Sequence, residues 1–169
     1  ILEVLYPIMQ GYDSVEIKAD VEIGGTDQKF NLLMGRRIQR YFELAEQDII
    51  TMHLLEGTDG KRKMSKSFGN YIGLNEKPAG MFRKIMSIPD KMIEKYFTLL
   101  TDIDVPKNLG PYESKLLLAE TIVAIYHGKT AGKSAREEFK KVFSKKEAPS
   151  EFEELKIANS QLLITDLLI

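Results

Sequence analysis

The first part of the chain alternates between strand-like and helix-like runs of apolar residues. A short β-prone run covers residues 19–23, and a second apolar run at residues 49–55 predicts a short buried strand. Between them, apolar positions repeat at helical spacing from about residue 28 to 46, with Thr26 or Asp27 as the expected N-cap. One helix between two strands predicts a βαβ unit in which the strands are parallel.

From about residue 74 the pattern is helical throughout. The expected helices are opened or capped by Pro78, Asp90, Pro111 and Thr130. The helix from Pro111 should end at Gly128, and the helix after it should bury Ala135, Phe139, Val142 and Phe143. The predicted fold class is therefore α/β: residues 1–73 form the C-terminal half of a doubly wound, Rossmann-like parallel sheet, and residues 74–147 form an all-α helical domain.

Composition and net charge limit which kinds of partner and which cellular location are expected. The 169 residues carry a net charge of −1, so no global basic field attracts nucleic acid, and any RNA contact must use local patches. One such patch is Lys140, Lys141, Lys145 and Lys146, although neighbouring glutamates make a solvated helix face the simpler interpretation. The chain has no cysteine, no apolar stretch long enough to span a membrane and no visible secretory signal, so a cytoplasmic location is expected.

The strongest candidate for chemistry is the stretch from Lys61 to Asn70, which reads KRKMSKSFGN and contains four cations and two serines. Lysine ammoniums and serine hydroxyls bind phosphate oxygens, and the flanking glycines allow a loop to close over a ligand. The alternative is a solvated surface loop, which is the usual role of a lysine- and serine-rich run.

Two further segments are candidate parts of a site. The Gly24-Gly25 turn joins a strand to a helix N-terminus, where unpaired N–H groups can meet an anion or a ribose; the alternative is a plain tight turn. The turn lacks the G-x-G-x-x-G pattern, which disfavours a nicotinamide or flavin enzyme. Upstream, Tyr6, Gln10 and Asp13 lie at i, i+4 and i+7, on one helix face that lines a cleft or faces solvent.

Taken in order, these three segments resemble the bacterial-type tyrosyl-tRNA synthetases, which are class I aminoacyl-tRNA synthetases. The matching motifs are Y-P-x-x-Q-x-Y-D-S, G-G-T-D-Q-K-F-N-L-L-x-G-R and K-M-S-K-S-x-G-N-Y-I, and they cover about the first half of the chain. Tryptophanyl-tRNA synthetase is the nearest alternative, but it typically has an alanine where this chain has Tyr12. A non-catalytic tRNA-binding module of the same fold is the alternative from another class.

The resemblance implies an enzyme that activates tyrosine with ATP and Mg²⁺ and transfers it to the 3′ end of tRNA(Tyr). Tyrosine would be bound by Tyr6 and Gln10 at its ammonium group, by Asp13 at its phenol and by Gln28 near its carboxylate. ATP would be bound by Gly25 and Asp27 at the ribose and by residues Lys63, Met64, Ser65, Lys66 and Ser67 at the phosphates. Lys63 and Lys66 would be catalytic, and no protein ligand for Mg²⁺ is predicted.

The resemblance also predicts features outside these motifs. The helical domain would contact the anticodon arm of the tRNA, and residues 148–169 would be a linker and the start of a truncated RNA-binding domain. The full-length enzyme would be a homodimer without a DNA or membrane partner. The class I signature His-Ile-Gly-His does not occur, since the two histidines are His53 and His127. We therefore expect a fragment that begins within the catalytic domain and is inactive alone.

Overall fold

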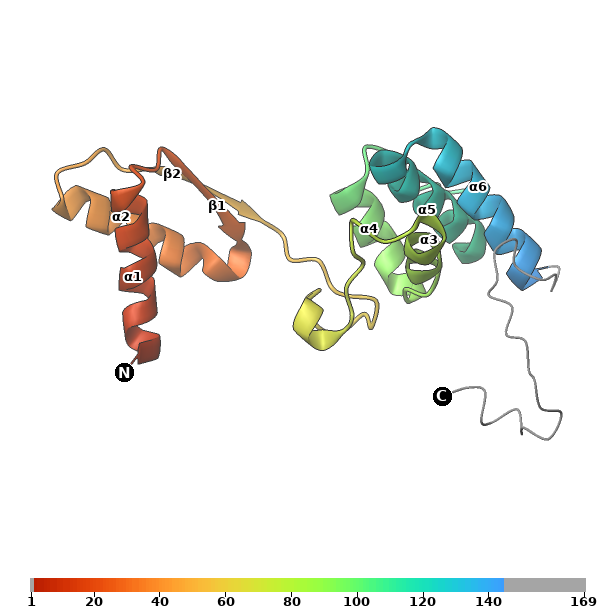
Figure 1. The fold of residues 1–169 in the computed structure, drawn as a ribbon, viewed down its shortest axis with the longest axis horizontal. Helices are drawn as coiled ribbons and strands as arrows, with labels where there is room; N and C mark the ends of the chain where they lie inside the picture. The colour runs from red at the N-terminus through yellow and green to blue at the C-terminus, as the bar shows by residue number, and fades with distance from the viewer. Residues whose placement is uncertain (1, 145–169) are drawn as a thin grey trace, which may run out of the picture.

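The computed structural model describes residues 2–144, which form two lobes joined by a connecting segment (Figure 1). The N-terminal lobe contains α1 (Leu2–Glu16), β1 (Val21–Gly25), the 3₁₀ turn η1 (Thr26–Gln28), α2 (Lys29–Tyr41) and β2 (Asp48–Met52). The helical lobe contains α3 (Pro78–Met86), η3 (Asp90–Met92), α4 (Ile93–Leu100), α5 (Pro111–His127), α6 (Lys129–Phe139) and η4 (Lys140–Ser144). The predicted linker at residues 148–169 lies outside the described residues.

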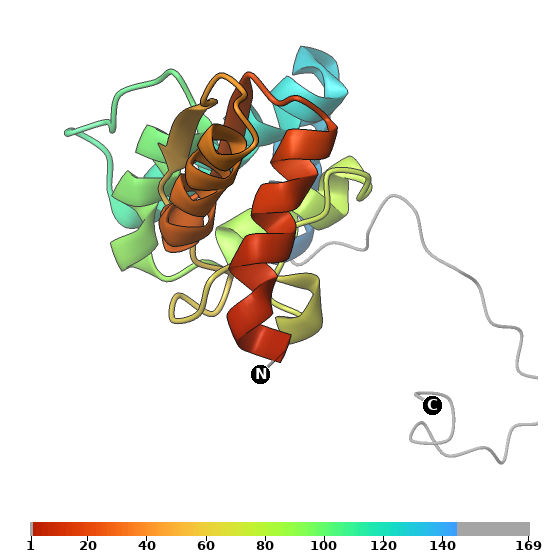
Figure 2. The same cartoon turned by 90° about the vertical axis from the view of Figure 1, so that its left-hand side faces the viewer.

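The two strands of the N-terminal lobe are parallel, as predicted. Val21 pairs with Asp48 and Gly25 pairs with Met52, so the carboxyl ends of both strands lie at the same edge. Helix α1 packs against α2 and runs across it (Figure 1 and Figure 2). An α/β unit with a parallel pair of strands is thus confirmed, whereas a doubly wound sheet needs more strands than these two and stays a prediction.

Only one face of this two-stranded sheet is covered within residues 2–144. Positions in β2 alternate between exposed and half-buried, with Ile50 47% and Met52 58% exposed. The prediction of a buried second strand is therefore wrong within residues 2–144, because the described helices cover only one side of the sheet. Among the described side chains of this lobe, Leu32 is the one buried apolar residue. Within residues 2–144 this lobe thus leaves apolar side chains of both strands exposed.

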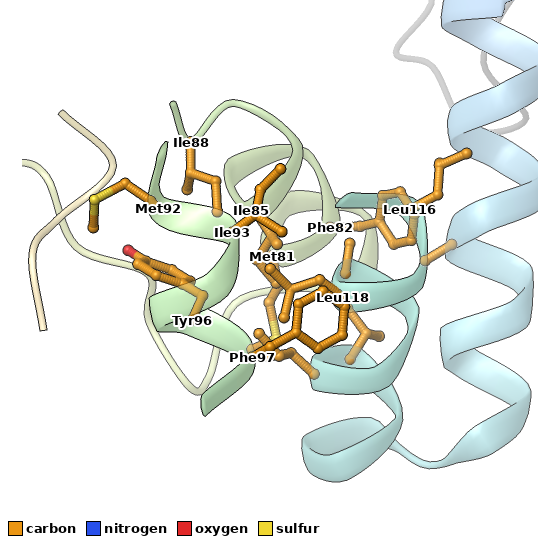
Figure 3. Close-up of a cluster of buried hydrophobic side chains, with 14 residues drawn as sticks. Met81, Phe82, Ile85, Ile88, Met92, Ile93, Tyr96, Phe97, Leu116 and Leu118 are labelled. Carbon is orange, nitrogen blue, oxygen red and sulfur yellow. The ribbon is translucent and has the colours of Figure 1, made fainter. Parts of the chain in front are cut away.

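The hydrophobic core lies in the helical lobe (Figure 3). Helix α5 packs against α3, α4 and α6. Fourteen buried apolar side chains form one cluster, among them Phe82, Ile85, Tyr96, Phe97 and Leu118. The helices that begin at Pro78 and Pro111 are confirmed, because proline fixes its own φ and needs no N–H partner in a first helical turn.

Several predicted details of the helix ends are wrong. Thr26, Asp27 and Asp90 belong to 3₁₀ turns and cap no helix with their side chains. The first N–H groups of α2 and α4 instead donate to the backbone carbonyls of Thr26 and Asp90. Thr130 is the second residue of α6, since Gly128, at φ 90°, both ends α5 and precedes α6. Phe143, expected in the core, is 54% exposed on η4.

Two further boundaries differ from the sequence pattern. Helix α2 ends at Tyr41 rather than near residue 46, because Glu43 adopts the left-handed φ of 58°. Strand β2 ends at Met52, so His53 lies beyond it. Within residues 2–144 no helix is both long and apolar enough to cross a membrane.

Candidate functional site

The cationic stretch folds as a hairpin rather than an irregular loop. Lys63 and Glu56 form an antiparallel bridge, flanked by hydrogen bonds from Met64 N to Leu55 O (2.8 Å) and from Gly57 N to Arg62 O (2.9 Å). The chain reverses at Asp59-Gly60, where Gly60 has the left-handed φ of 61° that favours glycine. We call residues 55–70 the lysine loop.

The second half of the lysine loop is a capped 3₁₀ turn, η2 (Lys66–Phe68). The hydroxyl of Ser65 accepts a hydrogen bond from the backbone N–H of Ser67 at 3.2 Å. Gly69 ends the turn with a φ of 64°. The backbone is thus held in one shape, while the side chains of Lys63 and Lys66 are exposed and available to a ligand.

The lysine loop is anchored on the helical lobe. The phenol of Tyr96 donates to the backbone carbonyl of Glu56 at 2.7 Å, and the Glu56 carboxylate pairs with Lys95. Burial first, and then the charges of Glu56 and Asp59, raise the pKa of Tyr96 to about 12, so the phenol stays protonated and able to donate. Apolar side chains at both ends of the hairpin, Leu55 and Met64, pack against the core cluster.

The loop reaches the N-terminal lobe through one ion pair. Nζ of Lys63 lies 3.1 Å from Oδ2 of Asp27, which sits in η1 directly beyond the end of β1. The hydrogen bond from Lys63 lowers the pKa of Asp27. Gly25, the last residue of β1, lies directly under this carboxylate, since a Cβ there would be 2.5 Å from Oδ1 of Asp27. Three residues predicted to bind ATP therefore converge.

The residues predicted to bind tyrosine are more dispersed. Gln10, on α1, donates to Oε1 of Glu22 in β1 at 3.0 Å, and Gln28 accepts from Asn31 at 3.0 Å. Tyr6 and Asp13 are exposed on α1 and form no hydrogen bond or ion pair with Asp27 or Lys63 in the described part of the chain. Their roles stay predictions.

The family is settled by comparison with known proteins. The sequence profile of the tRNA synthetases class I (W and Y) matches residues 1–144. The chain belongs to this family.

Curated relatives within the family carry the name tyrosine–tRNA ligase. The chain is 51% identical to the protein of Carboxydothermus hydrogenoformans over 166 residues, 50% to that of Aquifex aeolicus over 173 and 48% to that of Thermotoga maritima over 180. These alignments cover 92%, 99% and 100% of this chain but 40%, 44% and 45% of the relatives. The chain thus spans less than half the length of the relatives that it matches.

Solved structures of the family share the fold. The tyrosyl-tRNA synthetase of Archaeoglobus fulgidus, complexed with L-tyrosine, matches with a TM-score of 0.55 and 24% identity over 79% of this chain and 50% of that one. A truncated mitochondrial tyrosyl-tRNA synthetase of Aspergillus nidulans matches with a TM-score of 0.58 and 20% identity over 82% of this chain and 46% of that one. The chain therefore shares part of the fold of these two structures.

Two polar residues that form several hydrogen bonds, Glu22 and Asn70, were not among the residues predicted for the site. The carboxylate of Glu22 accepts hydrogen bonds from Gln10 (3.0 Å), Ser14 (3.2 Å) and Gln47. Asn70, the last residue of the lysine loop, is buried, and its side chain forms hydrogen bonds with four other residues of the loop. Glu22 could have been noticed from the sequence, because it is a charged residue inside the apolar run Val21–Gly25 and a charged residue in such a run needs polar partners. Asn70 lies within the third motif, but nothing local marks it as buried.

Proposed function

We propose that this chain supplies part of the catalytic centre of a tyrosine–tRNA ligase, which forms tyrosyl-adenylate from tyrosine and ATP and then charges tRNA(Tyr). The observation that carries the proposal is the Lys63–Asp27 ion pair. It brings the first lysine of the K-M-S-K-S motif to the aspartate of the G-G-T-D-Q turn, so one nucleotide could span both. The names of the relatives support tyrosine as the substrate.

The proposed roles match the chemistry of each residue to a part of ATP. Asp27 and Gly25 hold the ribose of ATP, with the carboxylate accepting from sugar hydroxyls. Lys63 and Lys66 neutralise charge on the β- and γ-phosphates, and Met64, Ser65 and Ser67 shape the backbone around them. Mg²⁺ bound to the phosphates of ATP would share this neutralisation, and no residue of this chain is assigned as its ligand.

The chemistry needs no covalent enzyme intermediate. A carboxylate oxygen of tyrosine attacks the α-phosphorus of ATP, and the bond to the bridging oxygen breaks to release pyrophosphate. The 3′-terminal ribose hydroxyl of the tRNA then attacks the tyrosyl carbonyl and AMP leaves. Positioning and electrostatic stabilisation of the leaving pyrophosphate supply the rate enhancement.

The amino acid pocket is proposed on α1. Tyr6 and Gln10 bind the ammonium group, Gln28 lies near the carboxylate, and Asp13 accepts a hydrogen bond from the phenol. Where the complete enzyme closes over Asp13, phenylalanine would leave that carboxylate without its partner, which is costly for a buried group. Tryptophan activation is the second candidate within the family, and the tyrosine ligases among the relatives disfavour it.

The domain assignments complete the proposal. Residues 1–73 belong to a doubly wound sheet, supported by a parallel strand pair with the candidate site beyond its carboxyl edge. Residues 74–147 contact the anticodon arm of the tRNA, and the complete enzyme is a homodimer that acts in the cytoplasm. A purely RNA-binding role is disfavoured by the two lysines of the motif, because RNA binding alone needs no pyrophosphate site.

The test is amino-acid-dependent ATP–pyrophosphate exchange, measured on the protein made from the complete reading frame that encodes this chain. Tyrosine should support exchange, and tryptophan and phenylalanine should not. Lys63→Ala and Lys66→Ala should each lower the exchange rate by about 10²–10³-fold, because each removes a preorganised cation from the transition state. Lys133→Ala, at an exposed position on α6, is the matched control. Wild-type exchange rates in both motif variants contradict the assignment.

A further inference from the structure

Asn70 is the most deeply buried polar residue of the lysine loop. It comes after Gly69, which ends η2, and is only 4% exposed, whereas the cationic side chains around it face solvent. A buried carboxamide is stable only if both its N–H groups and its oxygen find partners. The partners of Asn70 therefore indicate what this residue does.

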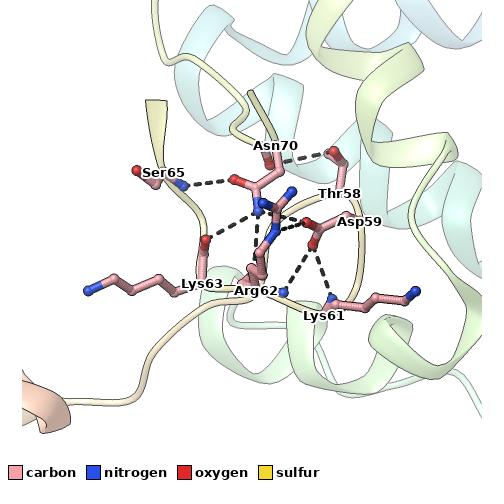
Figure 4. A network of polar contacts seen from close by, with 7 residues as sticks. All are labelled: Thr58, Asp59, Lys61, Arg62, Lys63, Ser65 and Asn70. Atoms are coloured by element: carbon pink, nitrogen blue, oxygen red, sulfur yellow. Dashed lines mark hydrogen bonds and ion pairs between the residues drawn. The ribbon is translucent and has the colours of Figure 1, made fainter. Parts of the chain in front are cut away.

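All of those partners belong to the lysine loop (Figure 4). The Nδ2 group donates to Lys63 O at 3.2 Å, to Arg62 O at 3.4 Å and to Oδ2 of Asp59 at 3.2 Å. The Oδ1 atom accepts from the backbone N–H of Ser65 at 2.9 Å. One side chain thus holds the backbone on both sides of Met64, at the two residues that flank it.

The backbone of Asn70 closes the network. Its carbonyl accepts from the backbone N–H of Thr58 at 2.9 Å, on the first strand of the hairpin. Gly57, next to Thr58, leaves the room that this contact needs, because a Cβ there would lie 2.2 Å from Cγ of Asn70. The asparagine therefore fixes the turn, the second strand and the start of η2 together.

We propose that Asn70 is a positioning residue of the lysine loop, whose carboxamide sets where the ammonium groups of Lys63 and Lys66 lie relative to Asp27. This inference rests on the proposed function, because it assigns Asn70 a role in pyrophosphate binding through the two lysines. Asparagine suits the position chemically, since it offers donors and an acceptor in one planar group. Aspartate has the same size but, when ionised, only acceptors, and these would face the carboxylate of Asp59 and two carbonyls.

The test uses two substitutions at Asn70 and one beside it, in the protein made from the complete reading frame. Asn70→Ala removes the hydrogen bonds of the carboxamide and keeps the backbone bond to Thr58. Asn70→Asp replaces the donor group by an acceptor at the same size, and Gly57→Ala displaces the carboxamide by steric overlap. The matched controls are Asn75→Ala, at an exposed asparagine, and Gly110→Ala, where no atom lies within 4 Å of the added Cβ. If Asn70→Ala fails to fold, Asn70→Asp carries the same test.

Two readouts separate positioning from plain structural support. In pyrophosphate exchange, the three variants should lose on the order of 10–100-fold in kcat, because displaced catalytic groups cost rate, while the KM for tyrosine stays unchanged. In brief tryptic digestion, cleavage within Lys61–Lys66 should become faster than in the controls. The inference is overturned if folded variants lose thermal stability only, with kcat and cleavage of the loop as in the controls.

The outcome also distinguishes the two proposals. If the unsubstituted protein shows no tyrosine-dependent exchange, the proposed function fails, and the role of Asn70 in pyrophosphate binding fails with it. If the unsubstituted protein is active and Asn70→Asp is equally active, the assignment of Asn70 fails while the proposed function stands.

Discussion

The ammonium group of Lys63 lies 3.1 Å from the carboxylate of Asp27, although 36 residues separate them in the sequence. Asp27 belongs to the N-terminal lobe, and Lys63 belongs to a loop that Tyr96 and Lys95 tie to the helical lobe. The side chains are 54% and 33% exposed, so water screens the pair and its contribution to stability is small. Its importance under the proposed function would be geometric, because a nucleotide whose ribose binds Asp27 would bring its phosphates toward Lys63.

The first prediction concerns Asp27 and the binding of ATP. Asp27→Asn should raise the KM for ATP by about 10–100-fold, because hydrogen bonds to a charged group contribute about 1.5–3 kcal/mol. The KM for tyrosine and the thermal midpoint should change little, since the pair with Lys63 is exposed. Steady-state pyrophosphate exchange and thermal unfolding measure these quantities, with Asp104→Asn, at an exposed loop position, as the control. A large loss of stability with unchanged KM for ATP would show that the pair is structural.

The sequence predicted those parts of the fold that depend on neighbouring residues. Prolines marked the starts of α3 and α5, Gly128 marked the end of α5, and the alternation of apolar runs predicted the parallel strand pair. The side-chain caps failed because 3₁₀ turns satisfy the same N–H groups through the backbone. Burial of β2 failed because burial depends on what covers both faces of a sheet, which no local pattern records.

For the candidate site, too, the sequence indicated some residues and missed others. Asp27, Gly25 and Lys63 converge, as the ordered motifs indicated. Glu22 and Asn70 were missed because their importance arises from contacts with other segments. Glu22 collects donors from α1 and from the residue before β2, and Asn70 bonds back across the hairpin. Contacts of this kind appear only once the chain is folded.

A second prediction follows from the contacts of Glu22. Its carboxylate orients Gln10, which is proposed to bind the ammonium group of tyrosine. Glu22→Gln keeps the size but replaces one acceptor oxygen by a donor, so at least one of its three hydrogen bonds is lost. We expect the KM for tyrosine to rise by about 5–50-fold, equivalent to about 1–2 kcal/mol, with a smaller change for ATP. Glu137→Gln, at an exposed position on α6, is the control. Equal effects on both substrates would contradict a role specific to tyrosine.

A third prediction concerns the stability of the hairpin at low pH. Hydrogen bonds from the backbone N–H of Lys61, then from Arg62 and Asn70, lower the pKa of Asp59 from 3.8 to about 2. A lowered pKa in the folded state means that the ionised carboxylate favours the folded hairpin. That contribution is fully present above about pH 4 and is lost as the pH falls toward 2.

The titration of Asp59 can be followed directly by NMR. Its carboxyl carbon and the amide protons of Lys61 and Arg62 should titrate together with a midpoint near 2. Asn70→Ala should raise that midpoint, because it removes one donor to the carboxylate. Asp59→Asn should abolish the shared titration of the two amides. A midpoint at the ordinary value of 3.8 would show that these hydrogen bonds are absent in solution.

The last prediction concerns the anchor of the lysine loop on the helical lobe. Tyr96 is fully buried and donates its phenol proton to the carbonyl of Glu56. Tyr96→Phe leaves the ring in the core but removes the donor, so we expect a loss of about 1–2 kcal/mol in the free energy of unfolding. Tyr126→Phe, at a position 49% exposed, is the control. Chemical denaturation measures the loss, and brief trypsin digestion should show faster cleavage within Lys61–Lys66. If stability falls without faster cleavage, the phenol supports the core alone and the loop is held by its other contacts.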